Sequence, residues 1–123
     1  MERNVIIATA PSTHPRFGGI RVRDGRGILV ANNRVIGPWT NAISATDVIE
    51  AVIEQNDLEA TQFAIAFGLN RVEPALLISV SNTVVRNNRI EGAGTAGVFV
   101  FEACYNTLFG NAFKLDRNVD GVA

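Results

Sequence analysis

The sequence predicts an all-β solenoid, a fold in which short strands stack in successive coils. The first observation is a repeated segment: residues 31–37 read Ala-Asn-Asn-Arg-Val-Ile-Gly, and residues 86–92 read Arg-Asn-Asn-Arg-Ile-Glu-Gly. Weaker copies occupy residues 54–60 and 109–115. The central Asn of the four copies falls at Asn33, Asn56, Asn88 and Asn111, so the gaps are 23, 32 and 23 residues. A fixed period of this size, with about nine extra residues in the third copy, is typical of a solenoid.

The second observation is that apolar residues hold fixed places relative to each central Asn. Three residues before the Asn, the side chain is always aliphatic: Val30, Ile53, Val85 and Leu108. Two residues after it stand Val35, Leu58, Ile90 and Phe113. Residues 19–23 and 97–101 alternate with a period of two, which places every second side chain on one face of a strand. These columns predict three short strands in each coil.

The repeat pattern resembles the right-handed parallel β-helices of the pectate-lyase-like kind. It is Gly-Ile-x-Val-x-x-Gly-x-x-Ile-x-Val-x-Asn-Asn-x-Val-x-Gly, read from Gly19 to Gly37 and less fully from Gly97 to Leu115. The resemblance implies a parallel β-helix of about four coils, with an Asn at the bend between the second and third strands. We expect this central Asn to adopt left-handed backbone angles, which Asn tolerates well. Stacked coils would also let successive Asn amides form a ladder.

The chain is read as one β-helix domain or segment over residues 1–123. Residues 1–17 form an irregular part or partial coil, and the coils span 18–40, 41–62, 63–95 and 96–118. We expect residues 5–7 to be the second strand of an incomplete coil, and residues 118–123 to begin a further first strand. The third coil is expected to carry a T1-type loop insertion at 71–79. In the resembled family such loops wall a substrate groove, but adjacent aliphatic residues here also suit a cover for the stack or a subunit contact.

Residues 46–60 give conflicting local and global signals. Thr46 or Asp47 could cap a helix whose apolar face holds Val48, Ile49, Val52 and Ile53. The same apolar residues also fall in the columns of the repeat, and a helix would interrupt the stack. We therefore predict strands here, because tertiary context overrides local propensity. A small α/β protein built on a 46–60 helix is the alternative.

Composition excludes several function classes. The formal net charge is −1 and the arginines are scattered, so no basic stripe indicates nucleic-acid binding. No apolar run is long enough for a membrane helix, and the N-terminus does not resemble a secretory signal. A single cysteine, Cys104, excludes an internal disulfide, so the compartment stays undetermined.

The candidate chemistry lies on the first strand of each coil and the turn after it. Asp24, Asp47 and Glu102 share one repeat position, nine residues before the central Asn. Neighbouring coils would bring such acids close enough for a Ca²⁺ site or a carboxylate pair for glycoside chemistry. The favoured alternative is structural, because Asp is common in turns. Other candidate ligand-binding residues are the cations that could grip a sugar carboxylate and the aromatics that could stack on a sugar ring: Arg21, Arg23, Phe99, Phe101 and Trp39.

Trp39 has two interpretations, a platform for a sugar ring or a cover for the core at a corner, and we favour the second. The complete acid and base sets of the resembled enzymes are not recognisable in this sequence. We therefore expect a noncatalytic β-helix module that binds a glycan, assembles with itself, or both. Self-association would use the open solenoid ends or the 71–79 insertion, and the chain could be a segment of a larger β-helix protein. The alternative is a lyase, hydrolase or epimerase domain acting on uronate-type polymers. No cofactor is expected beyond a possible Ca²⁺ ion.

Overall fold

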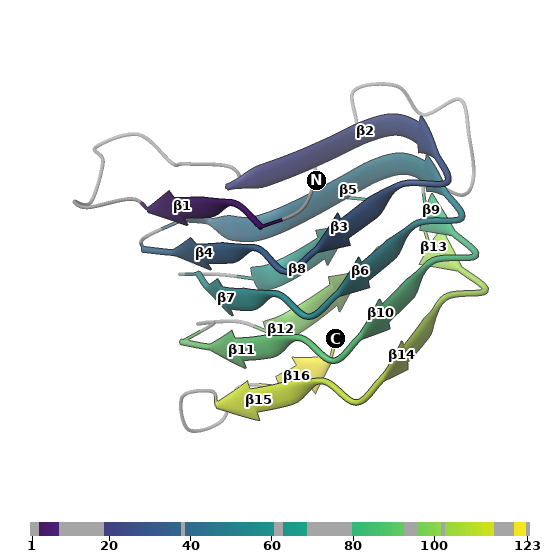
Figure 1. The fold of residues 1–123 in the computed structure, drawn as a ribbon. Helices are drawn as coiled ribbons and strands as arrows, with labels where there is room; N and C mark the ends of the chain where they lie inside the picture. The colour runs from purple at the N-terminus through teal and green to yellow at the C-terminus, as the bar shows by residue number, and fades with distance from the viewer. Residues whose placement is uncertain are drawn as a thin grey trace.

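In the computed structural model, the described residues are 3–7, 19–37, 39–60, 63–68, 80–92, 96–101, 103–114 and 120–122. Every regular element within these ranges is a β-strand, and the strands lie in stacked layers that the chain visits in turn (Figure 1). The all-β prediction is therefore confirmed. None of the described residues belongs to a helix that could cross a membrane.

The strands form three parallel sheets. The five-stranded sheet has the order β1 (Val5–Ile7), β4 (Arg34–Ile36), β7 (Asp57–Glu59), β11 (Arg89–Glu91) and β15 (Ala112–Lys114). The four-stranded sheet has the order β14 (Thr107–Phe109), β10 (Val84–Arg86), β6 (Val52–Glu54) and β3 (Leu29–Ala31). The seven-stranded sheet has the order β13 (Ala103–Cys104), β9 (Val80–Ser81), β5 (Asn41–Ile49), β8 (Phe63–Phe67), β12 (Ala96–Val100) and β16 (Asp120–Val122), with β2 (Ile20–Arg26) paired to β5.

The core lies between the sheets and is built from the repeat columns. Val35, Leu58 and Ile90 face inward at matching positions of β4, β7 and β11, and none is more than 1% exposed. Their neighbours in β7 and β11 are charged and point outward, and in β4 they are Arg34 and Ile36, which gives the alternation expected of strands with one buried face. Stacking identical columns buries a continuous core that no single coil could form alone.

Residues 46–60 are strands, as predicted from the repeat. The long strand β5 pairs with β2 on one side and with β8 and β9 on the other. Strands β6 and β7 follow it in the other two sheets. The helix alternative for this segment is wrong, because its apolar residues fill the columns that neighbouring coils require.

The four central asparagines form a ladder of side-chain amides. Nδ2 of each donates to Oδ1 of the next, over 3.0 Å from Asn33 to Asn56, 2.9 Å from Asn56 to Asn88 and 3.0 Å from Asn88 to Asn111. The backbone N–H of each donor residue bonds to the same oxygen. Asn33, Asn56 and Asn88 are buried, so these bonds satisfy polar groups inside the stack.

The prediction that these asparagines adopt left-handed backbone angles is wrong. The left-handed residue is the one before each of them: Asn32 (φ 56°), Gln55 (φ 53°), Asn87 (φ 54°) and Gly110 (φ 63°). The turn therefore divides two tasks between neighbours. The first residue makes the sharp bend with its side chain exposed, and the second points its amide into the stack.

The first strand was assigned to the wrong sheet. β1 pairs with β4, with Val5 opposite Arg34, so it occupies the place of a third strand and not of a second. The cause is Asn4, whose backbone N–H and Nδ2 both donate to Oδ1 of Asn33 over 3.0 Å. Asn4 therefore extends the ladder by one further rung.

The third copy also departs from the simple period. Asn41 pairs with Phe63, an offset of 22 residues, whereas Val48 of the same strand pairs with Val80, an offset of 32. The predicted 71–79 insertion falls between these pairs but outside the described residues, so it stays a prediction. Ile65 and Phe67 belong to the main core, whereas Phe63 of the same strand lies in a second small cluster with Phe99.

The last strand lies where a further first strand was expected. β16 pairs with β12 in the seven-stranded sheet, with Val122 opposite Val98. The period of 23 placed Gly121 there, so the register is shifted by one residue.

Candidate functional site

The sequence-predicted cations lie on the outer face of β2. Arg21 and Arg23 are exposed and alternate with Ile20 and Val22, which turn towards the core. Nε of Arg23 lies 3.5 Å from Oδ2 of Asp24, a solvated ion pair. An exposed pair of this kind contributes little to stability and leaves the guanidinium group accessible.

The predicted acid column has a conformational explanation. Asp24 and Asp47 both adopt left-handed backbone angles, with φ of 52° and 55°. Asp is one of the few residues with a side chain that tolerates this region. The Asp24 side chain is 72% exposed, whereas Asp47 is half-buried. Glu102 lies outside the described residues. Within the described ranges, no group of three or more His, Cys, Asp or Glu side chains could hold a metal ion.

The arginines and the predicted aromatics share one face but do not meet. Arg21, Ser44, Ala66 and Phe99 stand opposite one another in a single column across β2, β5, β8 and β12. Three strand spacings separate Arg21 from Phe99, or about 14 Å. Ser44 and Ala66 are only 3% and 0% exposed. The accessible parts of this column are therefore its two ends.

The aromatic end is a row of three rings. The Phe63 and Phe99 ring centroids lie 4.5 Å apart, and those of Phe99 and Phe101 lie 6.5 Å apart, with interplanar angles of 23° and 18°. Phe63 covers one side of Phe99, whereas Phe101 is 51% exposed at the end of the row. Phe101 is therefore the accessible platform, with Phe99 as its support.

Trp39 has a different environment. Its ring packs against the main core, and its Nε1 donates to the backbone oxygen of Ile36 over 3.1 Å. A partly buried indole with its N–H already bonded covers a corner of the stack, as the favoured interpretation of Trp39 states.

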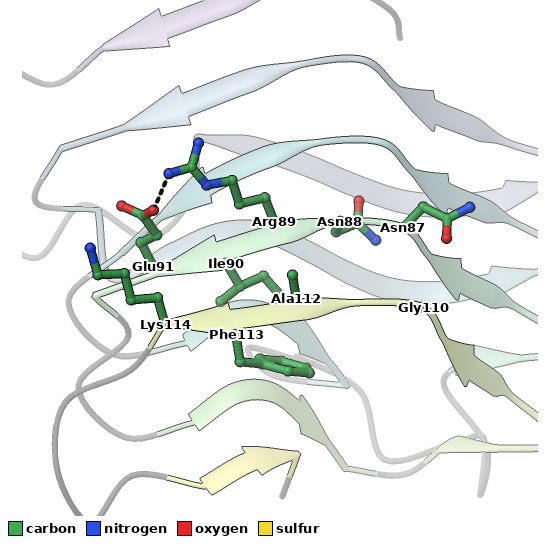
Figure 2. A pocket seen from close by; sticks show the side chains of 9 residues that line it. All are labelled: Asn87, Asn88, Arg89, Ile90, Glu91, Gly110, Ala112, Phe113 and Lys114. Carbon is green, nitrogen blue, oxygen red and sulfur yellow. Dashed lines mark hydrogen bonds and ion pairs between the residues drawn. The ribbon is translucent and has the colours of Figure 1, made fainter.

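A depression that the sequence did not indicate lies on the outer face of the five-stranded sheet. It has a volume of about 370 Å³ and lies over β11 and β15 (Figure 2); we call it the β11–β15 depression. The outward side chains that line it come from these two strands and the turns before them. They are Asn87, Arg89, Glu91, Ala112 and Lys114.

Three of these side chains carry charge. Arg89 Nη2 donates to Oε1 of Glu91 within β11, as the dashed line in Figure 2 shows. Lys114 stands opposite Glu91 on β15, and both lie at one end of the depression, whereas Asn87 lies at the other. Ala112 stands opposite Arg89 and contributes only a methyl group to the floor.

The depression exists because two columns of side chains become small at the last coil. Arg34, Asp57, Arg89 and Ala112 occupy one outward column of the sheet. Gly110 replaces the side chains of the neighbouring turn column, and a Cβ there would collide with Oδ1 of Asn87. The change from charged residues to Ala112 in this column is visible in the sequence and could have indicated the depression. The depth of the depression also depends on how Asn87 and Lys114 flank it.

The protein-family comparison matches residues 18–119 to the right handed beta helix region. The chain belongs to the right-handed β-helix family. This membership agrees with the three parallel sheets and with the resemblance inferred from the repeat. Comparison with curated proteins gave no match, and comparison with solved structures gave none either.

This right-handed β-helix therefore offers two accessible surfaces suited to binding. The first is the exposed ring of Phe101 on the seven-stranded sheet. The second is the β11–β15 depression, where a carboxylate, an ammonium group and an amide surround a small apolar floor. Both involve the coil that contains residues 96–114.

That coil also holds most of the large apolar side chains that are exposed in the described part of the chain. Four of the six are aromatic residues of this coil: Phe101, Tyr105, Phe109 and Phe113. They lie on different faces of the coil, because Phe101 follows β12, Phe109 is on β14 and Phe113 is on β15. Each is therefore a separate exposed ring, and only Phe101 is stacked in the row with Phe99.

Proposed function

We propose that this chain is a noncatalytic β-helix module of about four coils that binds a glycan through the aromatic surface of its last coil. The observation that supports the proposal is the half-exposed ring of Phe101, held at the end of the row by Phe99. An aromatic face packs against the apolar face of a sugar ring. A rigid ring loses little conformational entropy on binding, which favours it as an anchor.

The backbone angles of the acid column favour binding over catalysis. Asp24 and Asp47 stand where the chain needs left-handed angles, so their presence has a reason that requires no reaction. Asp24 is also paired with Arg23 and largely exposed. The pKa of a general acid or base is usually shifted by burial and by neighbouring charges. An exposed side chain such as that of Asp24 lacks this burial. A polysaccharide lyase, hydrolase or epimerase remains the alternative.

The experiment is a binding measurement with soluble polysaccharides by affinity electrophoresis, using neutral and uronate polymers. We expect Phe101→Ala to weaken binding about tenfold, as loss of an aromatic anchor commonly does. Tyr105→Ala is the matched control, because it removes an exposed aromatic ring from the same coil outside the Phe63–Phe99–Phe101 row. Equal losses in both variants, or none in either, would contradict the proposal.

Self-association is a second candidate function, favoured by the strands at the end of the stack. In the described part of the chain, β14 and β15 are each hydrogen-bonded to a neighbouring strand on one side. Phe109 and Phe113 on these strands are 48% and 38% exposed. Open strand edges with apolar side chains are templates for pairing with another chain. The occupant we propose is a second copy of this chain, through the open end or the 71–79 insertion.

Light scattering after size exclusion tests this second candidate. A discrete dimer or trimer that becomes monomeric in the Phe109→Ser and Phe113→Ser double variant would support association through the end of the stack. A wild-type monomer at all concentrations would rule it out. Glycan binding by such a monomer would leave the first proposal intact.

A further inference from the structure

We infer that the β11–β15 depression holds a single neutral sugar unit, bound through its hydroxyl groups. This inference rests on the proposed glycan binding, since it assigns a second sugar site of defined chemistry to the same module. The site lies on the five-stranded sheet, whereas the Phe101 platform lies on the seven-stranded sheet, so the two can be tested separately.

The size of the depression supports a small ligand. Its volume of about 370 Å³ falls within the range of about 300 to 1,000 Å³ that small-molecule sites occupy. A long side chain at position 112, like those of Arg89 and Asp57 in the same column, would fill it. The methyl group of Ala112 instead leaves an apolar floor on which the C–H groups of a sugar can rest.

The charges around the depression select the type of ligand. Arg89 holds the Glu91 carboxylate through an ion pair, so this acceptor has a fixed position. Lys114 provides a donor beside it, and the Asn87 amide provides both a donor and an acceptor at the far end. Because a hydrogen-bond donor, Lys114, lies beside a hydrogen-bond acceptor, Glu91, the best ligand group is one that can both donate and accept hydrogen bonds.

A sugar hydroxyl meets that requirement, because it can donate to the Glu91 carboxylate and accept from the Lys114 ammonium. Arg89 and Lys114 carry two positive charges, and Glu91 together with exposed Glu59, which stands opposite it on β7, carries two negative charges. A sugar carboxylate would therefore gain no net attraction and would approach the like charge of Glu91. The arrangement therefore favours a neutral hexose unit over a uronate. Arg89 acts as a positioning residue, since its ion pair orients Glu91.

The experiment is a titration of the ¹⁵N-labelled protein with cellobiose, maltose and lactose, followed by amide chemical shifts. Glucuronate is the charged comparison. We expect shifts at residues 87–91 and 110–114 for at least one neutral disaccharide. Ala112→Trp, which fills the depression, should weaken this binding at least about tenfold. Thr107→Trp is the matched control, because it adds the same bulk to the exposed neighbouring edge strand β14.

The outcomes separate this inference from the proposed function. Shifts at the depression that Ala112→Trp removes and Thr107→Trp retains would support the inference. Shifts confined to Phe99 and Phe101 would support the proposed function and overturn this inference. Shifts at the depression without any at Phe101 would overturn the aromatic platform alone. Tighter binding of glucuronate than of every neutral disaccharide would overturn the assigned sugar class.

Discussion

Nδ2 of Asn56 donates to Oδ1 of Asn88 over 2.9 Å, although 32 residues separate them, whereas Asn33 and Asn56 make the same bond over 3.0 Å across 23 residues. The ladder therefore keeps one geometry whatever length of chain lies between its rungs. The strands on both sides of this corner also keep their register, with Ile53 opposite Val85 and Leu58 opposite Ile90. The ladder fixes the positions of β6, β7, β10 and β11 relative to one another.

Asn88→Ala should lower the free energy of unfolding by about 2–4 kcal/mol. The substitution removes two bonds donated by Nδ2, to Asn111 and to Ile53, and two accepted by Oδ1 from Asn56. Asn88 is buried, so the groups left behind have no solvent to replace these bonds. Urea denaturation with a constant m-value is the measurement.

Asn87→Ala is the matched control for this prediction. Asn87 is the adjacent residue, exposed and in the left-handed conformation, so its loss should cost about 1 kcal/mol from backbone strain alone. Equal costs for the two substitutions would show that the ladder bonds contribute nothing beyond the turn.

Gly19→Ala should destabilise the fold by about 1–3 kcal/mol through overpacking. A Cβ on Gly19 would collide with Cγ1 of Val35 and would lie 3.0 Å from the backbone oxygen of Ala42. Val35 is fully buried and cannot move aside. In the double variant Gly19→Ala and Val35→Ala, the smaller side chain at position 35 leaves room for the methyl group at position 19. The double variant should therefore lose less unfolding free energy than the sum of the losses of the two single variants. Strictly additive costs would place the strain at Ala42 instead.

Gly27→Ala serves as the contrasting case. Gly27 has φ of 65° and no atom within 4 Å of a Cβ placed there. Its cost of about 1 kcal/mol should come from the backbone alone and should be indifferent to Val35→Ala.

Stability should depend on pH through Arg26 and Glu50. Nε and Nη2 of Arg26 donate to the two oxygens of Glu50 over 3.0 and 2.8 Å. These bonds lower the pKa of Glu50 below its ordinary value and raise the pKa of Arg26. A carboxyl group whose pKa is lowered by folding stabilises the fold above its unfolded pKa, and the contribution disappears as the pH falls through the folded pKa.

The test compares wild type with Glu50→Gln from pH 7 to pH 2. Glu50→Gln should lower the urea midpoint slightly at neutral pH, because the pair is solvent-exposed. The two proteins should converge as Glu50 becomes protonated. A difference that persists unchanged at pH 2 would show that charge on Glu50 is not responsible.

The chain should release no product from uronate polymers, because the proposed function is noncatalytic. The measurement is a reducing-end assay combined with absorbance of unsaturated products, with and without added Ca²⁺. If cleavage occurs and Asp47→Asn abolishes it while Asp24→Asn does not, the enzyme alternative replaces the binding module. If cleavage persists in both variants, Asp24 and Asp47 are not the catalytic acids.

The sequence predicted the sheets well because inward columns such as Val35, Leu58 and Ile90 repeat wherever coils stack. It misplaced the left-handed residue because Asn32 and Asn33 are both asparagines. The other copies distinguish the two positions. Gln55 and Gly110 show that several residue types can make the bend, whereas all four ladder positions are Asn. The ladder position requires a side-chain amide of the length that Asn has, which restricts the residue type more than the left-handed backbone angle restricts the bend position.

The binding surfaces were only partly predictable. Alternation placed Phe99 and Phe101 on an outer face. The cover that Phe63 forms over one side of Phe99 was not predicted, because it depends on packing between coils. Likewise, the step from Arg89 to Ala112 is visible in the sequence. The hollow that it leaves needs Lys114 and Asn87 at the observed positions, and these depend on strand register and turn geometry.

The ladder also has a direction. From Asn4 to Asn88, each side-chain amide donates to Oδ1 of the next rung towards the C-terminus. Nδ2 of Asn56 and Nδ2 of Asn88 also donate in the opposite direction, to the backbone oxygens of Val30 and Ile53 in the preceding coil. Each of these two amides therefore ties its coil to the coils on both sides. Sliding one coil along its neighbour would break bonds in both directions, so the corner acts as a lock against slippage of strand register.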